Sequence, residues 1–448
     1  METKKKGFPA AFWVCACTEI FERLAYYLGR SLILIFVTAS VATGGLGLSD
    51  TVAANMQSNL TAFSYLLPLF GAVIVDKYIG ARYTTPVGMF IAAAGYFTGG
   101  IAKSSAGVYA MIFLVSLGLA LFKNGAIIGR VITDKSQMDP AFSMRYTLVN
   151  VGAFIGTFLV GILYKDVFAK DGVLGFAPCF KMAALMMVLG GLWYIFVCWR
   201  FLGDLGKLPF KKTLTEEEKA AEAKKKEETG TKQPLTMIEK KRIGAIFVAS
   251  LFSIVFWIFW YLGYMPVYFY WAENMDWVVA GYQVPSTWFD AANSLFCVIL
   301  GPVTAALWKK LAARPQGDMS LFRKTGLGIA IIGVGYLFYA AIDIMRGGEK
   351  ASVLWLIVFA FLTMGEMFFS PLGHSFISKY SPSRYLAVMM SVWGFATFIA
   401  AKSYGPVYGL LFGGKIEFKV ACIGVAVVSF AAALIMIALD KKLSALVD

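Results

Sequence analysis

Charged residues and histidine are scarce in this chain of 448 residues. Only 15% of the residues are charged and there is a single His, whereas 59% are hydrophobic and the mean hydropathy is +0.69. A soluble globular chain carries roughly 25% charged and 45–50% apolar residues. The composition therefore excludes an ordinary soluble protein and predicts a polytopic membrane protein, in which apolar runs of about 20 residues cross the bilayer.

The chain also lacks the residue patterns of common cofactor sites and catalytic sites. Its six cysteines lie mostly within or beside apolar runs, no pair of C-x-x-C units occurs, and one His cannot complete the usual Cys/His zinc patterns. We find neither a Ser/His/Asp set nor a phosphate-binding glycine loop. We therefore expect no enzyme activity, no metal ion and no bound cofactor.

Twelve apolar segments follow one another along the sequence, and each is predicted to form a transmembrane helix. A charged stretch separates the first six from the last six. We predict a six-helix bundle over residues 1–202, a cytoplasmic charged linker over 203–241 and a second six-helix bundle over 242–448, a layout that is typical of a transporter. The segments lie near 11–39, 51–76, 83–102, 107–129, 143–165, 180–201, 243–271, 286–311, 322–345, 351–378, 385–412 and 417–439.

Lys and Arg are distributed unevenly between the predicted loops. With the N-terminus inside, 29 of the 41 basic residues fall in cytoplasmic ends and loops, and 8 fall in outer loops. The positive-inside rule therefore predicts that both termini are cytoplasmic. The net charge of +14 then reflects topology, so the expected partner is the lipid bilayer and not nucleic acid. From the size and the absence of a targeting peptide, we expect a monomer in a bacterial inner membrane.

The first predicted helix carries ionisable residues at bilayer depth, where a charge costs roughly 2.5–3.5 kcal/mol or more. Spacings of three, four and seven residues place them on one broad stripe. A self-neutralising ion-pair strip would explain two of them, but the whole set favours the lining of a polar cavity. The members are Glu19, Glu22, Arg23, Tyr26, Tyr27 and Arg30.

Two further charges stand alone in predicted helices, Lys123 in the fourth and Glu366 in the tenth. Neither has a charged neighbour in the sequence, so each requires a partner across the bundle or a ligand. Basic groups in the first half and an acid in the second suit a zwitterion, whose carboxylate would bind Arg23 and Lys123 and whose ammonium would bind Glu366. The amides of Asn150 and Asn293 can add hydrogen bonds.

The same residues carry a resemblance to a known family. The segment 71–82 resembles the loop motif of the major facilitator superfamily. Glu19-Ile-Phe-Glu22-Arg23-Leu-Ala-Tyr26-Tyr27 resembles the E-x-x-E-R-F-x-Y-Y signature of the proton-coupled oligopeptide transporters, with Leu24 in place of Phe. Further segments that resemble this family lie in the fifth, eighth, tenth and eleventh predicted helices, at 142–152, 288–296, 365–373 and 389–393.

The resemblance implies a major facilitator fold and proton-coupled import of di- and tripeptides by alternating access. In that case Arg23 and Lys123 hold the carboxylate of the peptide, while Asn150, Asn293 and Glu366 hold its amino end. Proton coupling involves Glu19, Glu22, Arg23 and Arg30. The substrate site is completed by Tyr26, Tyr27, Arg30, Tyr65, Tyr261 and Trp393.

One position departs from the family pattern. The family usually has an acid in the seventh helix shortly after Phe-Trp, and here Tyr261 follows Phe256-Trp257 at that place. We therefore expect Arg30 to pair with Glu19 or Glu22 instead. The departure leaves an uncoupled peptide facilitator as an alternative. Two others are a transporter of another small anion such as nitrate, and a membrane nutrient sensor that signals through the central loop.

Overall fold

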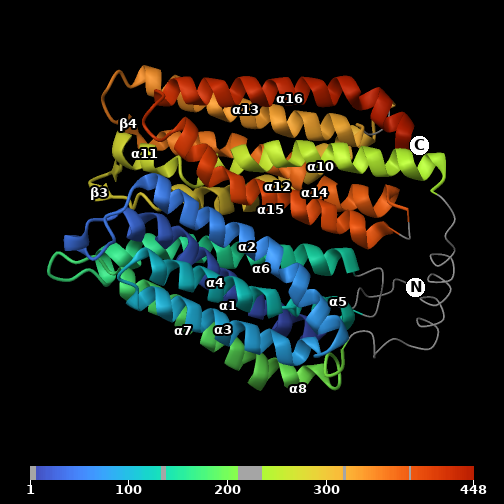
Figure 1. The fold of residues 1–448 in the computed structure, drawn as a ribbon, viewed down its shortest axis with the longest axis horizontal. Helices are drawn as coiled ribbons and strands as arrows, with labels where there is room; N and C mark the ends of the chain where they lie inside the picture. The colour runs from blue at the N-terminus through green and yellow to red at the C-terminus, as the bar shows by residue number, and fades with distance from the viewer. Residues whose placement is uncertain (1–6, 133–137, 210–234, 316–318, 383–384, 448) are drawn as a thin grey trace. The chain divides into compact units, whose positions relative to one another are not determined.

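A computed structural model describes residues 7–132, 138–209, 235–315, 319–382 and 385–447 of the chain, and they are almost entirely helical (Figure 1). The chain forms two compact units. The first comprises Met1–Ser49 and Leu66–Thr215, and the second comprises Asp50–Tyr65 and Glu216–Asp448. Most of the predicted linker lies outside the described residues, which stop at residue 209 and resume at 235.

The first unit is a bundle in which α1 packs on α6 and α7, while α3 packs on α4 and α7. Two π-helical turns extend α6 and α7, and a short 3-10 turn, η1, follows α1. The elements are α1 (Ala10–Thr38), η1 (Val41–Thr43), α2 (Asp50–Lys77), α3 (Ala81–Ile101), α4 (Ser105–Leu121), α5 (Asn124–Val131), α6 (Met138–Ile162), η3 (Leu163–Val167), α7 (Phe176–Trp193), η4 (Tyr194–Cys198) and α8 (Trp199–Leu202).

In the second unit α13 packs on both α14 and α16, α10 packs on α15, and α12 packs on α14 (Figure 1). The helices are α10 (Met237–Tyr264), α11 (Tyr268–Asn274), α12 (Trp288–Ala312), α13 (Leu321–Met345), the 3-10 turn η6 (Val353–Val358), α14 (Phe359–Tyr380), α15 (Leu386–Leu411) and α16 (Phe418–Val447). Four two-residue strands form two pairs. Strand β1 (Met275–Asp276) is parallel to β4 (Ala351–Ser352). Strand β2 (Val278–Val279) is antiparallel to β3 (Tyr282–Gln283).

When α4 and α5, α7 and α8, and α10 and α11 are each counted as one segment, the described residues form twelve helical segments, as the apolar runs predict. Eight of them are long and apolar enough to cross a membrane by length and composition alone. Helix α1 is not one of the eight, and it carries Glu19, Glu22, Arg23 and Arg30. Its polar stripe therefore sets it apart from a purely apolar membrane helix.

Two of the predicted helices are interrupted in the structure. The segment 107–129 breaks between α4 and α5, where Lys123 leaves the helical conformation and its backbone N–H lies 3.4 Å from the Thr85 hydroxyl oxygen. The segment 243–271 ends at Tyr264, shortly before Pro266, which has no N–H to continue a helix. Neither interruption changes the apolar pattern, which is why the sequence predicts continuous helices there.

The predicted loop motif joins two helix ends through Arg82. The Arg82 side chain is buried, donates hydrogen bonds to the carbonyl oxygens of Gly203 and Trp199, and lies 5.0 Å from the centre of the Trp199 ring. It therefore ties the beginning of α3 to the end of α8. The side chain of Asp76, the acidic member of the motif, lies outside the described residues.

The first part of α2 belongs to the second unit because polar side chains bind it to α15. The Ser58 hydroxyl donates to the Ala401 carbonyl oxygen over 2.6 Å, and the Lys402 ammonium donates to the Asn59 side-chain oxygen. The sequence places Lys402 in the outer half of the eleventh helix as a residue that snorkels or lines an entrance. In the structure Lys402 is exposed and has Asn59 of the same unit as a partner.

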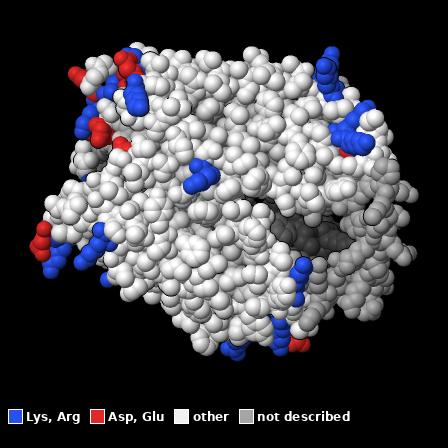
Figure 2. Space-filling view, viewed as in Figure 1, with Lys and Arg blue, Asp and Glu red and all other residues white. Residues whose placement is uncertain are grey.

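The lipid-facing surface is apolar. On the face seen in Figure 2, acidic and basic side chains gather towards the ends of the helices, and the wide middle is almost free of charge. Large apolar side chains such as Phe113, Leu251 and Leu434 are more than half exposed in the middle of their helices. Water would not tolerate so much exposed apolar surface, but hydrocarbon does.

Candidate functional site

Two glycines on α6 allow α1 to approach closely beside the ionisable stripe. A side chain at Gly152 would begin 2.8 Å from the Ile20 carbonyl oxygen, and one at Gly156 would begin 2.5 Å from the Leu24 carbonyl oxygen. Glycines four residues apart are a common means of bringing two membrane helices into backbone contact. The crossing therefore lies at the level of Glu19, Glu22 and Arg23.

We expect Gly156→Leu to separate α1 from α6 and to destabilise the protein by about 1–3 kcal/mol, because the added atoms overlap the α1 backbone. The melting temperature of the purified protein in detergent should fall. Gly424→Leu is the matched control, since Gly424 also lies in a membrane helix but has nothing within 4 Å of the added carbon. Equal melting temperatures for the two variants would contradict the importance of this crossing.

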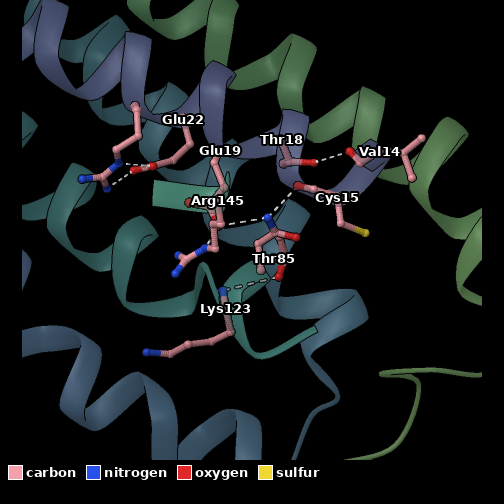
Figure 3. A network of polar contacts seen from close by, with 10 residues as sticks. Val14, Cys15, Thr18, Glu19, Glu22, Thr85, Lys123 and Arg145 are labelled. Atoms are coloured by element: carbon pink, nitrogen blue, oxygen red, sulfur yellow. Dashed lines mark hydrogen bonds and ion pairs between the residues drawn. The ribbon is translucent and has the colours of Figure 1, made fainter. Parts of the chain in front are cut away.

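Glu22 and Arg23 form a pair of unequal exposure on α1. The Glu22 side chain is fully buried, whereas 26% of the Arg23 side chain is exposed. Arg23 binds Glu22 with two hydrogen bonds, and one of them joins Nη2 to Oε1 over 2.5 Å (Figure 3). The Arg23 guanidinium also lies 4.9 Å from the centre of the Tyr26 ring. The acid is thus enclosed and the base faces outward.

Glu19 has partners from two other helices. Its Oε1 accepts hydrogen bonds from Arg145 Nε of α6 over 3.0 Å and from Asn124 Nδ2 of α5 over 3.1 Å (Figure 3). The Asn124 amide also donates to the Cys15 carbonyl oxygen over 2.8 Å. Only 3% of the Glu19 side chain is exposed, against 30% of the Arg145 side chain. The pattern of Glu22 and Arg23, a buried acid behind a partly exposed guanidinium, is therefore repeated here.

The other predicted residues of the first unit lie around these two pairs. The Lys123 ammonium donates to the Pro68 carbonyl oxygen of α2 over 2.9 Å, so its partner is a backbone group. The Arg30 guanidinium lies 4.5 Å from the centre of the Tyr27 ring. Asn150 is half-buried and donates to the carbonyl oxygen one turn earlier on its own helix, 3.0 Å away.

In the second unit the predicted residues Asn293 and Glu366 lie on neighbouring helices, α12 and α14. The Cys297 thiol lies 3.7 Å from both Asn293 Oδ1 and Glu366 Oε2. The Thr363 hydroxyl donates to Asn293 Oδ1 over 2.9 Å, and it is 2.5 Å from the hydroxyl of Tyr264 on α10. Glu366 is therefore surrounded by neutral hydrogen-bonding groups of its own unit, and Asn293 lies beside it.

Of the predicted aromatic residues of the second unit, Tyr261 and Trp393 pack against other aromatic rings, and Tyr65 is exposed. Tyr261 is 2% exposed and its ring lies 5.3 Å from that of Tyr404. Trp393 is 7% exposed and stacks on Phe369 at 5.9 Å. Tyr65 is 43% exposed and ends the part of α2 that belongs to this unit.

Sequence reasoning missed four residues that contact the predicted acids directly or through Asn293. These are Asn124, Arg145, Cys297 and Thr363. Two of them carried a usable signal. Asn124 follows Lys123 immediately, and Thr363 precedes Glu366 by three residues, which places it on the same face of the helix.

The chemistry available in the described residues is that of charge recognition. No group of three or more His, Cys, Asp and Glu side chains gathers as a metal ion would require, over the residues that the structure describes. The first unit offers partly exposed guanidinium groups, which bind carboxylates well. The second offers a carboxylate, which binds an ammonium group.

Comparisons with known proteins agree with the resemblance in the sequence. The model of the POT family matches residues 205–412. A di-/tripeptide transporter of Lactococcus lactis subsp. cremoris is 24% identical, over 86% of this chain and 86% of the relative. The peptide transporter YePEPT of Yersinia enterocolitica is 23% identical, over 89% of this chain and 86% of the relative.

Solved structures give the fold. A crystal structure of a peptide transporter POT in complex with sulfate superposes with a TM-score of 0.86 at 22% identity, over 99% of this chain and 98% of that chain. A POT family transporter in complex with 5-aminolevulinic acid superposes with a TM-score of 0.84 at 23% identity, over 98% of each chain. The predicted all-α membrane fold of the major facilitator type is therefore confirmed.

Proposed function

We propose that this chain, a member of the POT family, is a symporter that imports di- and tripeptides together with protons. The family match and the peptide transporters among its relatives support peptide import as the activity. Proton coupling is the general property of this family. The transported molecules are then a short peptide and protons, and the chain has the role of a transporter and not of an enzyme.

The observation that carries the proposal is the opposite charge offered by the two units. In the first, Arg23 and Arg145 are partly exposed while their carboxylate partners are buried. In the second, Glu366 has neutral neighbours in Cys297 and Asn293. A peptide has one carboxylate and one ammonium group, so each of its ends finds a complementary charge. We assign its carboxylate to Arg23 and Lys123, and its amino end to Glu366, Asn293 and Asn150.

The Glu22–Arg23 pair supplies a means of coupling to protons. Burial disfavours a charged carboxylate, and a neighbouring guanidinium favours it. When the carboxylate of the peptide takes Arg23 as its partner, Glu22 loses that support and accepts a proton more readily. Glu19 and Arg145 form a second pair of the same kind. We assign Arg30, which lies further along α1 beside Tyr27, to proton coupling as well. Peptide and proton are thereby loaded together.

The remaining predicted residues complete the binding surface. Tyr27 and Tyr65, which are at least partly exposed, supply aromatic surface for peptide side chains, whereas Tyr26, Tyr261 and Trp393 are buried and shape the site through packing. We place the transporter in a bacterial inner membrane with both termini in the cytoplasm, since that orientation agrees with the distribution of Lys and Arg. Because one chain carries both the basic and the acidic residues, a monomer suffices for transport.

Uptake of labelled dialanine into liposomes that contain the pure protein tests the proposal. We expect accumulation that requires an inward proton gradient and a negative interior, and that disappears when a protonophore is added. Empty liposomes are the control. Equilibration without accumulation would show a facilitator, and absence of uptake would overturn peptide transport itself.

A further inference from the structure

Near Glu366 lies a row of polar side chains from three helices, of which the proposed function uses only Asn293. It runs from Tyr264 on α10 through Thr363 on α14 to Asn293 on α12, with distances of 2.5 Å and 2.9 Å between successive polar atoms. Thr363 is fully buried and Tyr264 is 1% exposed. Hydroxyl groups in membrane helices often form hydrogen bonds to other helices, and here the partners lead towards the acid.

The Thr363 hydroxyl fixes the orientation of the Asn293 amide. Because Thr363 donates to Asn293 Oδ1, the two N–H groups of that amide point to the other side. The Cys297 thiol lies 3.7 Å from both Asn293 Oδ1 and Glu366 Oε2, so the amide and the Glu366 carboxylate are close neighbours. The Tyr264 hydroxyl has one proton. With the Thr363 proton donated to Asn293 Oδ1, Tyr264 donates to Thr363 and so holds it in turn, and the Phe359 carbonyl oxygen, 2.7 Å from the Tyr264 hydroxyl, is the alternative acceptor of that proton.

This orientation matters for the charge that Glu366 can bind. A carboxylate has about four acceptor positions, and the Asn293 amide and the Cys297 thiol can take only part of them. An ammonium group, with three donors, fits the remainder. If the amide turned over, its oxygen would face the carboxylate, and both the repulsion and the loss of a fixed geometry would weaken ammonium binding.

We propose that Thr363 is a positioning residue for recognition of the amino end of the peptide. It touches no substrate itself; it holds Asn293, which holds Glu366 in the orientation that accepts an ammonium group. This inference rests on the proposed function and adds to it a residue that determines specificity for peptides with a free amino end.

The test compares Thr363→Val, which keeps the shape and removes the hydroxyl, with Thr363→Ser, which keeps the hydroxyl. We expect Thr363→Val to raise KM for dialanine about tenfold with Vmax within twofold, since one buried hydrogen bond to a charged network is lost. Inhibition by N-acetyl-dialanine, which has no ammonium group, should change less than twofold. Thr363→Ser should restore KM to within about threefold of the wild type.

A double-mutant cycle tests whether Thr363 acts on substrate affinity through Glu366. In a Glu366→Gln background, Thr363→Val should change dialanine affinity by less than about twofold. The reason is that Thr363 affects the ammonium group only through Glu366, whose charge is already removed. Tyr264→Phe, which removes the hydroxyl that supports Thr363, should raise KM in the same direction by about threefold. It also keeps the inference testable if Thr363→Val does not fold.

Three results would overturn the inference. They are equal loss for dialanine and the acetylated peptide, equal loss in the valine and serine variants, and additive effects of Thr363→Val and Glu366→Gln. An unchanged KM in Thr363→Val, with normal wild-type uptake, rejects the role of Thr363 and leaves peptide transport intact. Absence of uptake by the wild type would reject the proposed function and this inference together.

Discussion

Glu22→Gln should abolish uphill uptake of dialanine and spare exchange of labelled for unlabelled peptide across the liposome membrane. The amide keeps the size of the side chain but cannot gain or lose a proton, so the pair with Arg23 no longer couples to the gradient. One proton moved inward at 100 mV supplies about 2.3 kcal/mol, which corresponds to roughly 50-fold accumulation. We expect that ratio to fall to one.

Glu417→Gln is the control for this variant. Glu417 is 70% exposed and pairs with Lys419 over 3.0 Å. It comes immediately before α16 and is distant in the sequence from the buried acids of the first unit. Its replacement should leave both accumulation and exchange at wild-type levels. Undiminished accumulation by Glu22→Gln would assign proton coupling to another residue, and loss of exchange in that variant would show a defect in substrate binding instead.

Arg145→Gln should be the most destabilising of the single replacements considered for the first unit. It leaves Glu19 buried with Asn124 as its remaining side-chain partner. Breaking a buried pair costs roughly 3–5 kcal/mol, and we expect the lower end because 30% of the Arg145 side chain is exposed. A clear fall in the melting temperature of the purified protein in detergent is the measurement.

The second replacement in this pair distinguishes charge from packing. Glu19→Gln combined with Arg145→Gln removes both charges and should recover most of the lost stability, because no buried charge is left alone. Lys207→Gln, at an exposed pair with Asp204 over 2.6 Å, should leave the melting temperature almost unchanged, because water screens an exposed pair. If the double variant were as unstable as Arg145→Gln alone, the shape of the arginine, and not its charge, would be what matters.

The fold follows from the sequence more directly than the partners of its charges do. Apolar runs separated by polar turns predict the twelve helical segments, since each run has the length that a bilayer requires. The break at Lys123 was missed because it depends on Thr85 of another helix, which takes up the freed N–H. A one-dimensional pattern does not record such a contact.

In the candidate site, too, a contact within one helix could be predicted from the sequence, whereas contacts between helices could not. Glu22 and Arg23 are adjacent on α1, and their pairing could be predicted because no other helix is involved. Lys123 was expected to require a partner across the bundle, and it contacts the Pro68 carbonyl oxygen of α2, a backbone group that no residue pattern marks. Arg145 lies within a segment that carries the family resemblance, but only the α1–α6 crossing at Gly152 brings it to Glu19.

If a peptide binds Arg23 as proposed, the pairing of Arg23 with Glu22 also limits how long the substrate stays bound. A peptide carboxylate that binds Arg23 replaces an existing partner, so the affinity it gains is the difference between two similar charge-assisted hydrogen bonds, each of about 1.5–3 kcal/mol. Glu22 can displace the peptide carboxylate from Arg23 again with little change in free energy. A vacant guanidinium would hold the peptide far longer, and slow dissociation would then set the turnover rate. On the proposed function, the enclosed acid would therefore favour modest affinity and quick release, which a carrier requires.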